Sequence, residues 1–387
     1  LFGVGTDGYV REYVYDSATN AWTLDDLNNL PQFSQGTQLS VWDNGSSIDL
    51  FGVHAGGGIE WLHESGGSWT SSAVATDGGM SAGTPLAIAE LGGDVFLFGV
   101  NGSGTVDEIT YDGTAWSSPS TLSVGADTFA NNSALGVKLW ASNGFTLFGV
   151  DNNGQIKNVF NYGSGLANQA LGGAPALSTS SSIAFYSDSS GIQQVFGATP
   201  GGDLAVFNFN LGSGAWNQYA LGGSIAPNTL SNSSSASVAI AGDLNEQDLF
   251  VVGADGLVRE DRYSYDTNSD SGLAVIDANT TFDPAAKLTA FTVGSSVNLF
   301  GVGQNGQALW AQSTAAGGWT GFVSLDSVTG NPAVTFAAGT ALAGVVRGGS
   351  LDLFAVGTDG HVKQYVYDGG GWTFASLDRL PFFPAGP

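Results

Sequence analysis

The tetrapeptide Leu-Phe-Gly-Val, or a close variant of it, recurs along the chain and constrains the fold more than any other feature. Its eight copies begin at Leu1, Leu50, Leu97, Leu147, Val195, Leu249, Leu299 and Leu353. In a chain of 387 residues, eight evenly spaced copies correspond to a repeat of about 48 residues. The sequence therefore predicts a repeat architecture, in which neighbouring copies of one small unit bury a shared core.

Each repeat contains four short apolar segments separated by turns, which predicts four antiparallel strands. The first strand precedes the tetrapeptide, and the tetrapeptide is the second strand. Asp-Gly or Asn-Gly then supplies the positive φ that two-residue hairpins require. The third strand alternates apolar and polar residues, as in residues 10–15, and a Trp usually opens the fourth strand. Clear first strands are residues 39–42, 86–88, 137–140 and 238–240.

The strand pattern predicts an all-β fold, because no window shows the apolar spacing of a capped helix. Radial repetition explains evenly spaced hairpins better than a sandwich or a barrel does. We therefore expect a single β-propeller domain over residues 1–387, with four-stranded antiparallel blades. The first strand is found only seven times, since the N-terminal repeat lacks it and residues 380–384 align with residues 30–34. Eight blades are predicted, with seven as the alternative.

The charge of the chain excludes several classes of function. Nine Lys and Arg residues against 34 Asp and Glu give a formal net charge of -25, which repels nucleic acids and anionic membrane surfaces. Because the chain has no Cys, disulfides and thiolate sites are excluded. No apolar run approaches the length of about 18 residues that a spanning helix needs, so membrane insertion is not expected.

The repeats resemble those of known propeller lectins. Residues 7–16, Asp-Gly-Tyr-Val-Arg-Glu-Tyr-Val-Tyr-Asp, followed by Trp22, are similar to the repeat of the fungal fucose-specific lectins of the Aleuria type. The whole repeat, with Phe-Gly-Val-Gly-Thr-Asp-Gly before the third strand, also resembles the bacterial Photorhabdus-type lectins, which have seven blades. The resemblance covers all eight repeats and implies a carbohydrate-binding lectin, not an enzyme, with glycans or glycoconjugates as partners.

The Aleuria resemblance implies a sugar site between blades, formed by an Arg, a Glu and a Trp. The Glu position is matched by Glu12, Glu108 and Glu260, whereas Trp61, Asn158, Val206, Trp310 and Gln364 occupy it in the other repeats. The Arg position holds no Arg at the seven places where the sequence contains it, which argues against fucose recognition by the family's mechanism. Its occupants are Asp49, Phe96, Thr146, Gln194, Asp248, Asn298 and Asp352.

Carbohydrate binding is also supported by the residue types themselves. A sugar packs its C–H face on an aromatic ring and offers its hydroxyl groups to carboxylates or amides. The sequence predicts several similar shallow sites at blade interfaces, which would gain avidity together. Packing between blades is the alternative role for the Trp residues, and a solvated strand face is the alternative for the Glu residues. The predicted sugar-binding residues are Trp22, Trp69, Trp116, Trp216, Trp319, Trp372, Glu12, Glu108 and Glu260.

Two other functions remain open at this point. A propeller-fold polysaccharide lyase needs a His or Tyr base with basic residues beside it, and the candidate bases are His54, His63 and His361. A glycoside hydrolase needs a carboxylate pair, and the sequence singles out none. A protein-binding scaffold would instead show one large apolar patch.

The sequence predicts no cofactor and no metal site. Residues 266–272 place oxygen ligands at alternate positions, as calcium loops do, but the closing Glu is absent and a surface loop is favoured. Glycosylation sequons at Asn44, Asn101, Asn131, Asn232 and Asn279 are compatible with a secreted or extracellular protein. Assembly into a homo-oligomer is possible and would add further sites.

Overall fold

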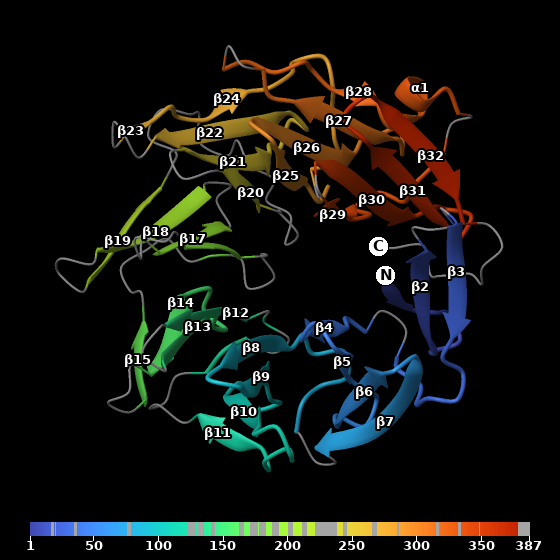
Figure 1. Ribbon diagram of the computed structural model, residues 1–387. Coiled ribbons are helices and arrows are strands. Elements are labelled where there is room, and N and C mark those ends of the chain that lie inside the picture. Colours follow the sequence, from blue (N-terminus) through green and yellow to red (C-terminus); the bar gives the residue numbers. More distant parts are fainter. Residues whose placement is uncertain are drawn as a thin grey trace. The chain divides into compact units, whose positions relative to one another are not determined.

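The structure of the chain is a computed structural model (Figure 1). It describes residues 1–16, 19, 21–34, 37–75, 79–122, 128–130, 133, 135–140, 144–161, 166–170, 177, 183–187, 193–199, 204–210, 215–220, 238–242, 246–264, 269–284, 286–314, 317–331, 334–347 and 349–377. The aligned segment 380–384, residues 266–268 of the calcium-like loop and the sequons at Asn131 and Asn232 lie outside these ranges. The chain divides into two compact units, Leu1–Thr179 and Ser180–Pro387.

Unit 1 contains four antiparallel sheets, numbered 1 to 4 in chain order. Sheet 1 has three strands among the described residues, as the absent first strand of that repeat predicts, and sheets 2 to 4 have four each. The strands are β1 (Phe2–Val4), β2 (Val10–Asp16) and β3 (Ala21–Asp26); β4 (Ser40–Asp43), β5 (Ile48–Val53), β6 (Ile59–Ser65) and β7 (Ser68–Ala75); β8 (Ala87–Leu91), β9 (Asp94–Val100), β10 (Val106–Tyr111) and β11 (Ser120–Leu122); and β12 (Gly136–Trp140), β13 (Gly144–Val150), β14 (Ile156–Asn161) and β15 (Leu166–Ala170).

Unit 2 contains sheets 5 to 8. In sheet 6 two short strands, β23 and β24, both pair with β22. The strands are β16 (Ala184–Ser187), β17 (Gln193–Ala198), β18 (Leu204–Asn210) and β19 (Ala215–Ala220); β20 (Val238–Gly242), β21 (Glu246–Val252), β22 (Val258–Ser264), β23 (Ser269–Asp270) and β24 (Ala274–Val275); β25 (Thr289–Val293), β26 (Ser296–Val302), β27 (Ala308–Gln312) and β28 (Val323–Ser324); and β29 (Ala343–Arg347), β30 (Ser350–Val356), β31 (Val362–Tyr367) and β32 (Trp372–Ser376).

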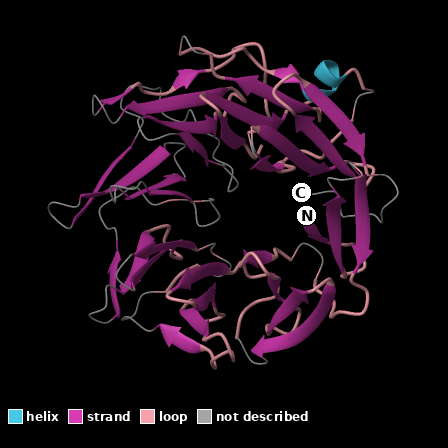
Figure 2. Ribbon diagram, viewed as in Figure 1, coloured by secondary structure: helices cyan, strands magenta, loops and turns pink. Residues whose placement is uncertain are grey.

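The eight sheets are the blades of an all-β propeller, four in each unit, so eight blades are confirmed and the alternative of seven is wrong. That residues 1–387 form one domain stays a prediction. Strands make up nearly all of the regular structure in Figure 2, and the five-residue helix α1 (Leu325–Thr329) is an addition that the sequence pattern did not predict. Within the described ranges, no helix has the length and apolar character needed to cross a membrane.

The outer strands differ from the prediction in two sheets. Trp116 and Trp319 do not open a fourth strand, because each forms only a single bridge, with Tyr111 and Ser313 respectively. The fourth strands begin later, at Ser120 and Val323. In sheet 3 the reason is visible in the sequence, since Pro119 has no backbone N–H and interrupts the ladder.

The turn between the second and third strands also differs from the predicted two-residue hairpin. In sheet 1 the N–H of Gly5 donates to the carbonyl of Tyr9 (2.8 Å), and the N–H of Gly8 donates to the carbonyl of Gly5 (3.0 Å). Gly8 adopts a φ of 84°. The loop therefore has three residues and ends on one left-handed glycine, the geometry of a type I turn followed by a bulge.

The glycine of the recurring tetrapeptide makes room for a residue of the preceding linker. A Cβ atom at Gly52 would lie 2.6 Å from Cε1 of Phe33 and 3.1 Å from Cδ2 of Leu39. The N–H of Phe33 in turn donates to the carbonyl of Gly8 (2.8 Å). The linker between sheets 1 and 2 is thus fixed to the turn of the first sheet and packed on the second strand of the next.

The core consists of clusters that each lie between two consecutive sheets. Between sheets 1 and 2, for example, Val10, Phe33, Leu50 and Leu62 are buried together. Comparable clusters join sheets 2 and 3, and sheets 3 and 4, within unit 1. In unit 2 they join sheets 5 and 6, 6 and 7, and 7 and 8. Each sheet is therefore stabilised mainly by its neighbours in the chain.

Candidate functional site

The Trp near the start of the outer strand packs against the preceding sheet. In four places its ring stands at 76–89° to the Phe of the recurring tetrapeptide, with ring centroids 5.4–5.7 Å apart. This edge-to-face arrangement is favourable for aromatic rings. Packing between blades, the alternative role given to the Trp residues, is therefore observed at these four places. The pairs are Phe2 with Trp69, Phe51 with Trp116, Phe250 with Trp319, and Phe300 with Trp372.

In two of these places the same Trp meets a predicted Glu. Glu12 lies opposite Phe2 in the β1–β2 ladder, and Glu260 lies opposite Phe250 in the β21–β22 ladder. The indole Nε1–H of Trp69 donates to Oε2 of Glu12 (2.8 Å), and that of Trp319 donates to Oε2 of Glu260 (2.9 Å). We call Glu12–Trp69 and Glu260–Trp319 the carboxylate junctions.

Burial and neighbouring charge act on the carboxylate junction of unit 1. Burial raises the pKa of Glu12, and the charges of Asp25 and Glu64 raise it further, against the lowering effect of the Trp69 hydrogen bond. Glu12 is half-buried, as is Trp69. The junction therefore combines a partly accessible Trp69 ring with a Glu12 carboxylate that is repelled by the negative charges of Asp25 and Glu64.

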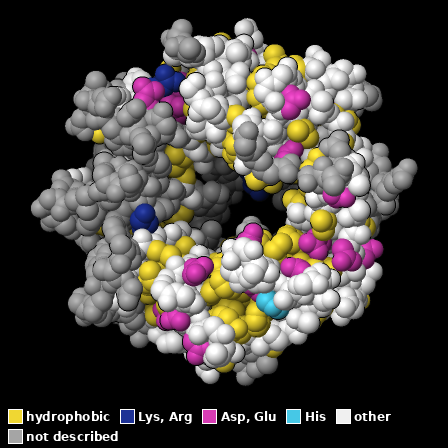
Figure 3. Space-filling view, in the orientation of Figure 1, with side chains coloured by type: hydrophobic (Ala, Val, Ile, Leu, Met, Phe, Trp, Pro, Cys, Tyr) yellow, Lys and Arg dark blue, Asp and Glu magenta, His cyan; other side chains and the backbone are white. Residues whose placement is uncertain are grey.

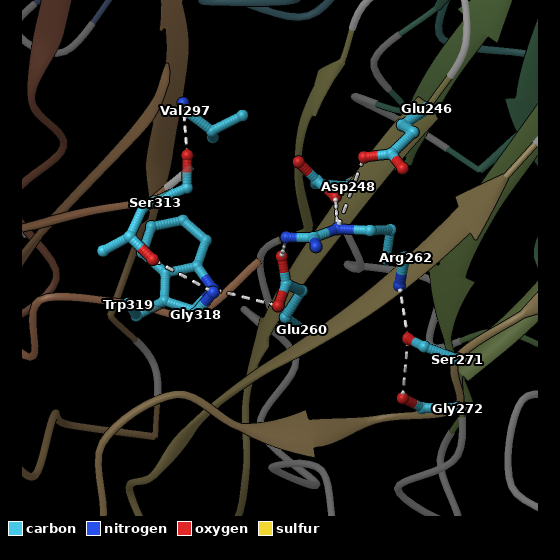
Figure 4. A network of polar contacts seen from close by, with 11 residues as sticks. Glu246, Asp248, Glu260, Arg262, Ser271, Gly272, Val297, Ser313, Gly318 and Trp319 are labelled. Atoms are coloured by element: carbon cyan, nitrogen blue, oxygen red, sulfur yellow. Dashed lines mark hydrogen bonds and ion pairs between the residues drawn. The ribbon is translucent and has the colours of Figure 1, made fainter. Parts of the chain in front are cut away.

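The carboxylate junction of unit 2 extends into a larger charged network (Figure 4). Arg262 donates from Nη2 to Oε1 of Glu260 (2.8 Å) and from Nε to Oδ1 of Asp248 (2.9 Å), and Oε2 of Glu246 lies 3.8 Å from Nε. Burial raises the pKa of Asp248 to about 6, because Arg262 offsets the burial and the charges of Glu260 and Glu246 only in part. Burial lowers the pKa of Arg262, but its carboxylate partners outweigh this effect and raise it.

The two remaining places have Trp where the carboxylate junctions have Glu. We call Trp61–Trp116 and Trp310–Trp372 the aromatic junctions; their rings lie at 76° and 67°, with centroids 5.6 and 5.4 Å apart. Trp61 donates to Asp49, and Trp310 donates to Asn298 (3.0 Å). The buried Nε1–H groups of Trp116 and Trp372 have no acceptor in the described parts of the chain. Where Trp stands in place of Glu on the third strand, the indole N–H of the Trp from the next sheet therefore has no acceptor among the described residues.

Of the other predicted sugar-binding residues, Glu108 does not form such a junction in the described structure. Glu108 occupies the same register position, opposite Phe98, and burial raises its pKa. The outer strand of the next sheet, β15, carries no Trp to meet it. Trp22 lies beside Tyr15 within sheet 1, with ring centroids 5.2 Å apart. Trp216 is half-buried on β19.

The candidate bases of an enzyme have separate partners. Nδ1 of His54 accepts from the N–H of Gly56 (3.0 Å), within its own turn. His63 lies opposite Asp49 in the β5–β6 ladder, and its Nδ1 is 2.6 Å from Oδ1 of Asp49. His361 lies in the turn after β30. In the residues that the structure describes, no three His, Asp or Glu side chains are placed to share a metal ion.

Sequence reasoning missed the contribution of Arg262 to the unit 2 junction. Arg262 and Asp248 are cross-strand partners, as are His63 and Asp49. The signal lay in the alternation, because Arg262 follows Glu260 by two residues and so shares its face of the strand. The sequence search looked for an Arg on the second strand. It could not find Arg262, which lies on the third strand opposite Asp248.

Acidic side chains are spread over the face seen in Figure 3, where Lys and Arg are rare. Five of the nine basic residues are already paired with carboxylates: Arg11, Lys157, Arg259, Arg262 and Lys363. Three of these pairs lock a turn Asp to a residue four positions later, as in Asp255–Arg259. The electrostatic surroundings of the junctions are therefore strongly negative.

A cavity of about 340 Å³ lies beside the carboxylate junction of unit 1, because its lining includes Phe2, which packs on Trp69. It includes none of the predicted sugar-binding residues. Its lining consists of Leu1, Phe2, Gly3, Val4, Thr37, Leu39 and Val41.

Comparison with solved structures identifies proteins with the same fold. BP39L lectin from Burkholderia pseudomallei is similar with a TM-score of 0.65 and 21% sequence identity, over 89% of this chain and 99% of that one. This match shows that the two chains share a fold. No protein-family model matches the sequence, and no curated protein is similar to it.

Two fungal proteins are similar at lower TM-scores. The Aleuria aurantia lectin, in a variant bound to Fucα1-6GlcNAc, has a TM-score of 0.43 and 15% identity over 78% of this chain and 96% of its own. AofleA from Arthrobotrys oligospora has a TM-score of 0.44 and 18% identity over 74% of this chain and 84% of its own.

Proposed function

We propose that the protein is a non-enzymatic, carbohydrate-binding lectin with several similar sites at the interfaces between consecutive blades. The observation that carries this proposal is the recurrence of one arrangement, an indole whose N–H is held by a carboxylate of the preceding sheet, at Glu12–Trp69 and Glu260–Trp319. An aromatic face beside fixed oxygen acceptors suits the C–H face and the hydroxyl groups of a sugar.

Repetition makes weak sites useful. A single shallow sugar site binds weakly, but two or more on one chain raise avidity by about 10² to 10⁴ when the ligand is also multivalent. The two carboxylate junctions, one in each unit, are the first candidates for such sites. We infer that the protein acts on glycan-bearing surfaces, and such surfaces are consistent with a secreted or extracellular location. A homo-oligomer would multiply the sites further.

A glycan array probed with the full chain tests this function. We expect binding to a restricted set of glycans that is competed by a simple sugar, with no cleavage of the bound glycan. The matched variants are Glu12→Ala and Asp43→Ala, two carboxylates of unit 1, of which Glu12 holds an indole and Asp43 is exposed and accepts from the N–H of Gly45 in its own turn. Glu12→Ala should weaken binding more than Asp43→Ala. Absence of binding to any glycan, or release of shortened products, would contradict the proposal.

A further inference from the structure

The outer edge of sheet 1 has no strand paired to it in the described structure. Its strands follow the order β1-β2-β3, so β1 is the edge strand, whereas sheets 2 to 4 each have a further strand at this place. Leu1 exchanges both backbone hydrogen bonds with Tyr13 of β2 (3.0 and 2.8 Å). Because such pairs alternate along an antiparallel ladder, the N–H and C=O of Phe2 point to the open edge. Sheet 1 therefore presents a backbone donor and acceptor to a further strand.

The open edge borders the cavity of about 340 Å³. One wall of this cavity is residues 1–4, and the other contains Thr37, Leu39 and Val41. Thr37 is 7% exposed, and its hydroxyl group has no hydrogen-bond partner in the described part of the chain. Val41 is 51% exposed, whereas its equivalent in sheet 3, Ile88, is half-buried. A buried hydroxyl without a partner and an exposed apolar wall both favour a ligand here.

The other seven sheets show which residue fits opposite the Phe of the tetrapeptide. In each of them the first-strand residue at this place is small: Ser40, Ala87, Gly136, Ala184, Ala239, Thr289 and Ala343. The hydroxyl of Ser40 donates to the carbonyl of Leu86 (2.7 Å), just before the first strand of the next sheet, and Thr289 donates likewise to Leu342 (2.7 Å). For sheet 1 the corresponding carbonyl is that of Leu39, which lines the cavity. Ser or Thr therefore fits best opposite Phe2.

The residues on either side of the small residue also follow a pattern. The one before it is a Leu that packs over the Gly of the tetrapeptide, since a Cβ atom at Gly52 would lie 3.1 Å from Cδ2 of Leu39. The same contact recurs at 2.9 Å for Gly99 with Leu86, Gly149 with Leu135, and Gly301 with Leu288. The residue after it is Val or Ile in four sheets, at Val41, Ile88, Val137 and Ile240. The equivalent glycine of sheet 1, Gly3, lines the cavity.

We propose that the open edge of β1 is a strand-acceptor site for an extended segment of another polypeptide that reads Leu, then Ser or Thr, then Val or Ile. The segment adds antiparallel to β1, and its Ser or Thr exchanges both backbone hydrogen bonds with Phe2. Its Leu packs over Gly3, its hydroxyl donates to the carbonyl of Leu39, and a polar group of its backbone pairs with the hydroxyl of Thr37.

The occupant is assigned to a different polypeptide because the described copies of this pattern are already used. Those of sheets 2, 3, 4 and 7 each pair within their own sheet. The same holds for a second copy of this chain. The site goes beyond the proposed lectin function and does not depend on it.

A capped peptide that copies residues 38–43, Gln-Leu-Ser-Val-Trp-Asp, tests the inference by calorimetry and amide hydrogen exchange with the full chain. We expect a single binding site and exchange of the Phe2 amide slowed at least about tenfold at saturation, with a smaller change at Gly3, whose amide faces β2. Leu in place of the peptide's Ser should weaken binding at least about tenfold, because the place opposite Phe2 takes only small residues. Ala there should weaken it about fivefold through loss of the hydroxyl hydrogen bond.

Variants of the chain separate this site from general effects. Gly3→Val fills the place of the peptide's Leu and should weaken binding at least about tenfold. Thr37→Val removes a hydroxyl that has no partner in the described structure, so it should weaken the peptide about threefold without lowering the melting temperature. Val41→Ser should also weaken the peptide, whereas Val275→Ser, which changes an exposed valine of β24 in unit 2, should not.

Several outcomes would overturn the inference. They are equal binding of the Ser and Leu peptides, unchanged exchange at Phe2, and a Phe2 amide that is already protected in the free chain. A dimer in light scattering that the peptide dissociates would make a second copy the occupant and the assignment to another polypeptide wrong. A chain that binds glycans but not the peptide refutes this inference alone.

Discussion

The carboxylate and aromatic junctions use the same positions of the repeat and differ in one residue of the third strand. In both kinds a Trp of one sheet stands edge-to-face on a Phe of the preceding sheet. Glu at the position opposite that Phe gives the indole N–H an acceptor, whereas Trp leaves the N–H of Trp116 and Trp372 unpaired within the described structure. The ring packing of this Trp is therefore common to both kinds of junction, whereas the hydrogen bond of its indole N–H occurs only in the carboxylate junctions.

The largest effect is expected from removing the cation of the unit 2 network. Arg262→Ala leaves Asp248 buried without its ion-pair partner, and we expect the free energy of unfolding to fall by about 3 kcal/mol. Adding Asp248→Asn should recover at least half of this loss. Chemical denaturation of the three variants measures both values, and equal stability of Arg262→Ala and the wild type would show that the network is not stabilising.

Trp→Phe substitutions compare the two kinds of junction directly. Trp69→Phe removes a hydrogen bond to a carboxylate, whereas Trp116→Phe removes a buried N–H that has no acceptor among the described residues. Both lose a similar amount of ring. Trp69→Phe should therefore be the more destabilising, by about 1.5–2 kcal/mol. Equal losses on denaturation would mean that the Glu12–Trp69 hydrogen bond contributes nothing.

The raised pKa of Asp248, about 6 against an ordinary value of 3.8, gives a smaller and pH-dependent effect. The folded state holds this proton more tightly than the unfolded state, so unfolding releases it between about pH 4 and 6. The stability of the wild type relative to Asp248→Asn should fall as the pH rises through this window, on the order of 1 kcal/mol, and level off above it. A pH-independent difference in melting experiments would show that Asp248 titrates normally.

The smallest change is expected for Glu12→Gln. The amide oxygen can still accept from Trp69, and loss of the charge relieves repulsion from Asp25 and Glu64. Stability should remain within about 0.5 kcal/mol of the wild type. A loss of stability as large as that of Trp69→Phe would show that the charge of Glu12, and not its hydrogen bond to Trp69, stabilises this junction.

The sequence predicted the strands because the fold repeats them, and eight copies of one alternating pattern leave few alternatives. Glu12, Glu260, Trp69 and Trp319, selected as sugar-binding residues, lie at interfaces between consecutive sheets, and their sugar binding stays a prediction. Their pairing was not predicted, since each Glu bonds to a Trp of the following repeat, 57 or 59 positions away.

Other features depended on local geometry that periodicity does not encode. Pro119 shortens the outer strand after Trp116, and α1 depends on tertiary contacts. The side chain of Asp326 accepts from the hydroxyl of Tyr365 (2.7 Å) and from the N–H of Val334 (2.8 Å). Arg262 was missed because the search was limited to the second strand. Residues that act through a cross-strand partner require the register, which only the structure supplies.

Cross-linking of glycan-coated beads by the full chain tests most directly whether the junctions are sugar sites. Beads bearing a glycan identified on the array should aggregate with the wild type and disperse on addition of the free sugar. The double variant Glu12→Ala and Glu260→Ala should fail to aggregate them, while Asp43→Ala should behave as the wild type. Undiminished aggregation by a folded double variant would contradict the assignment of the carboxylate junctions as glycan sites.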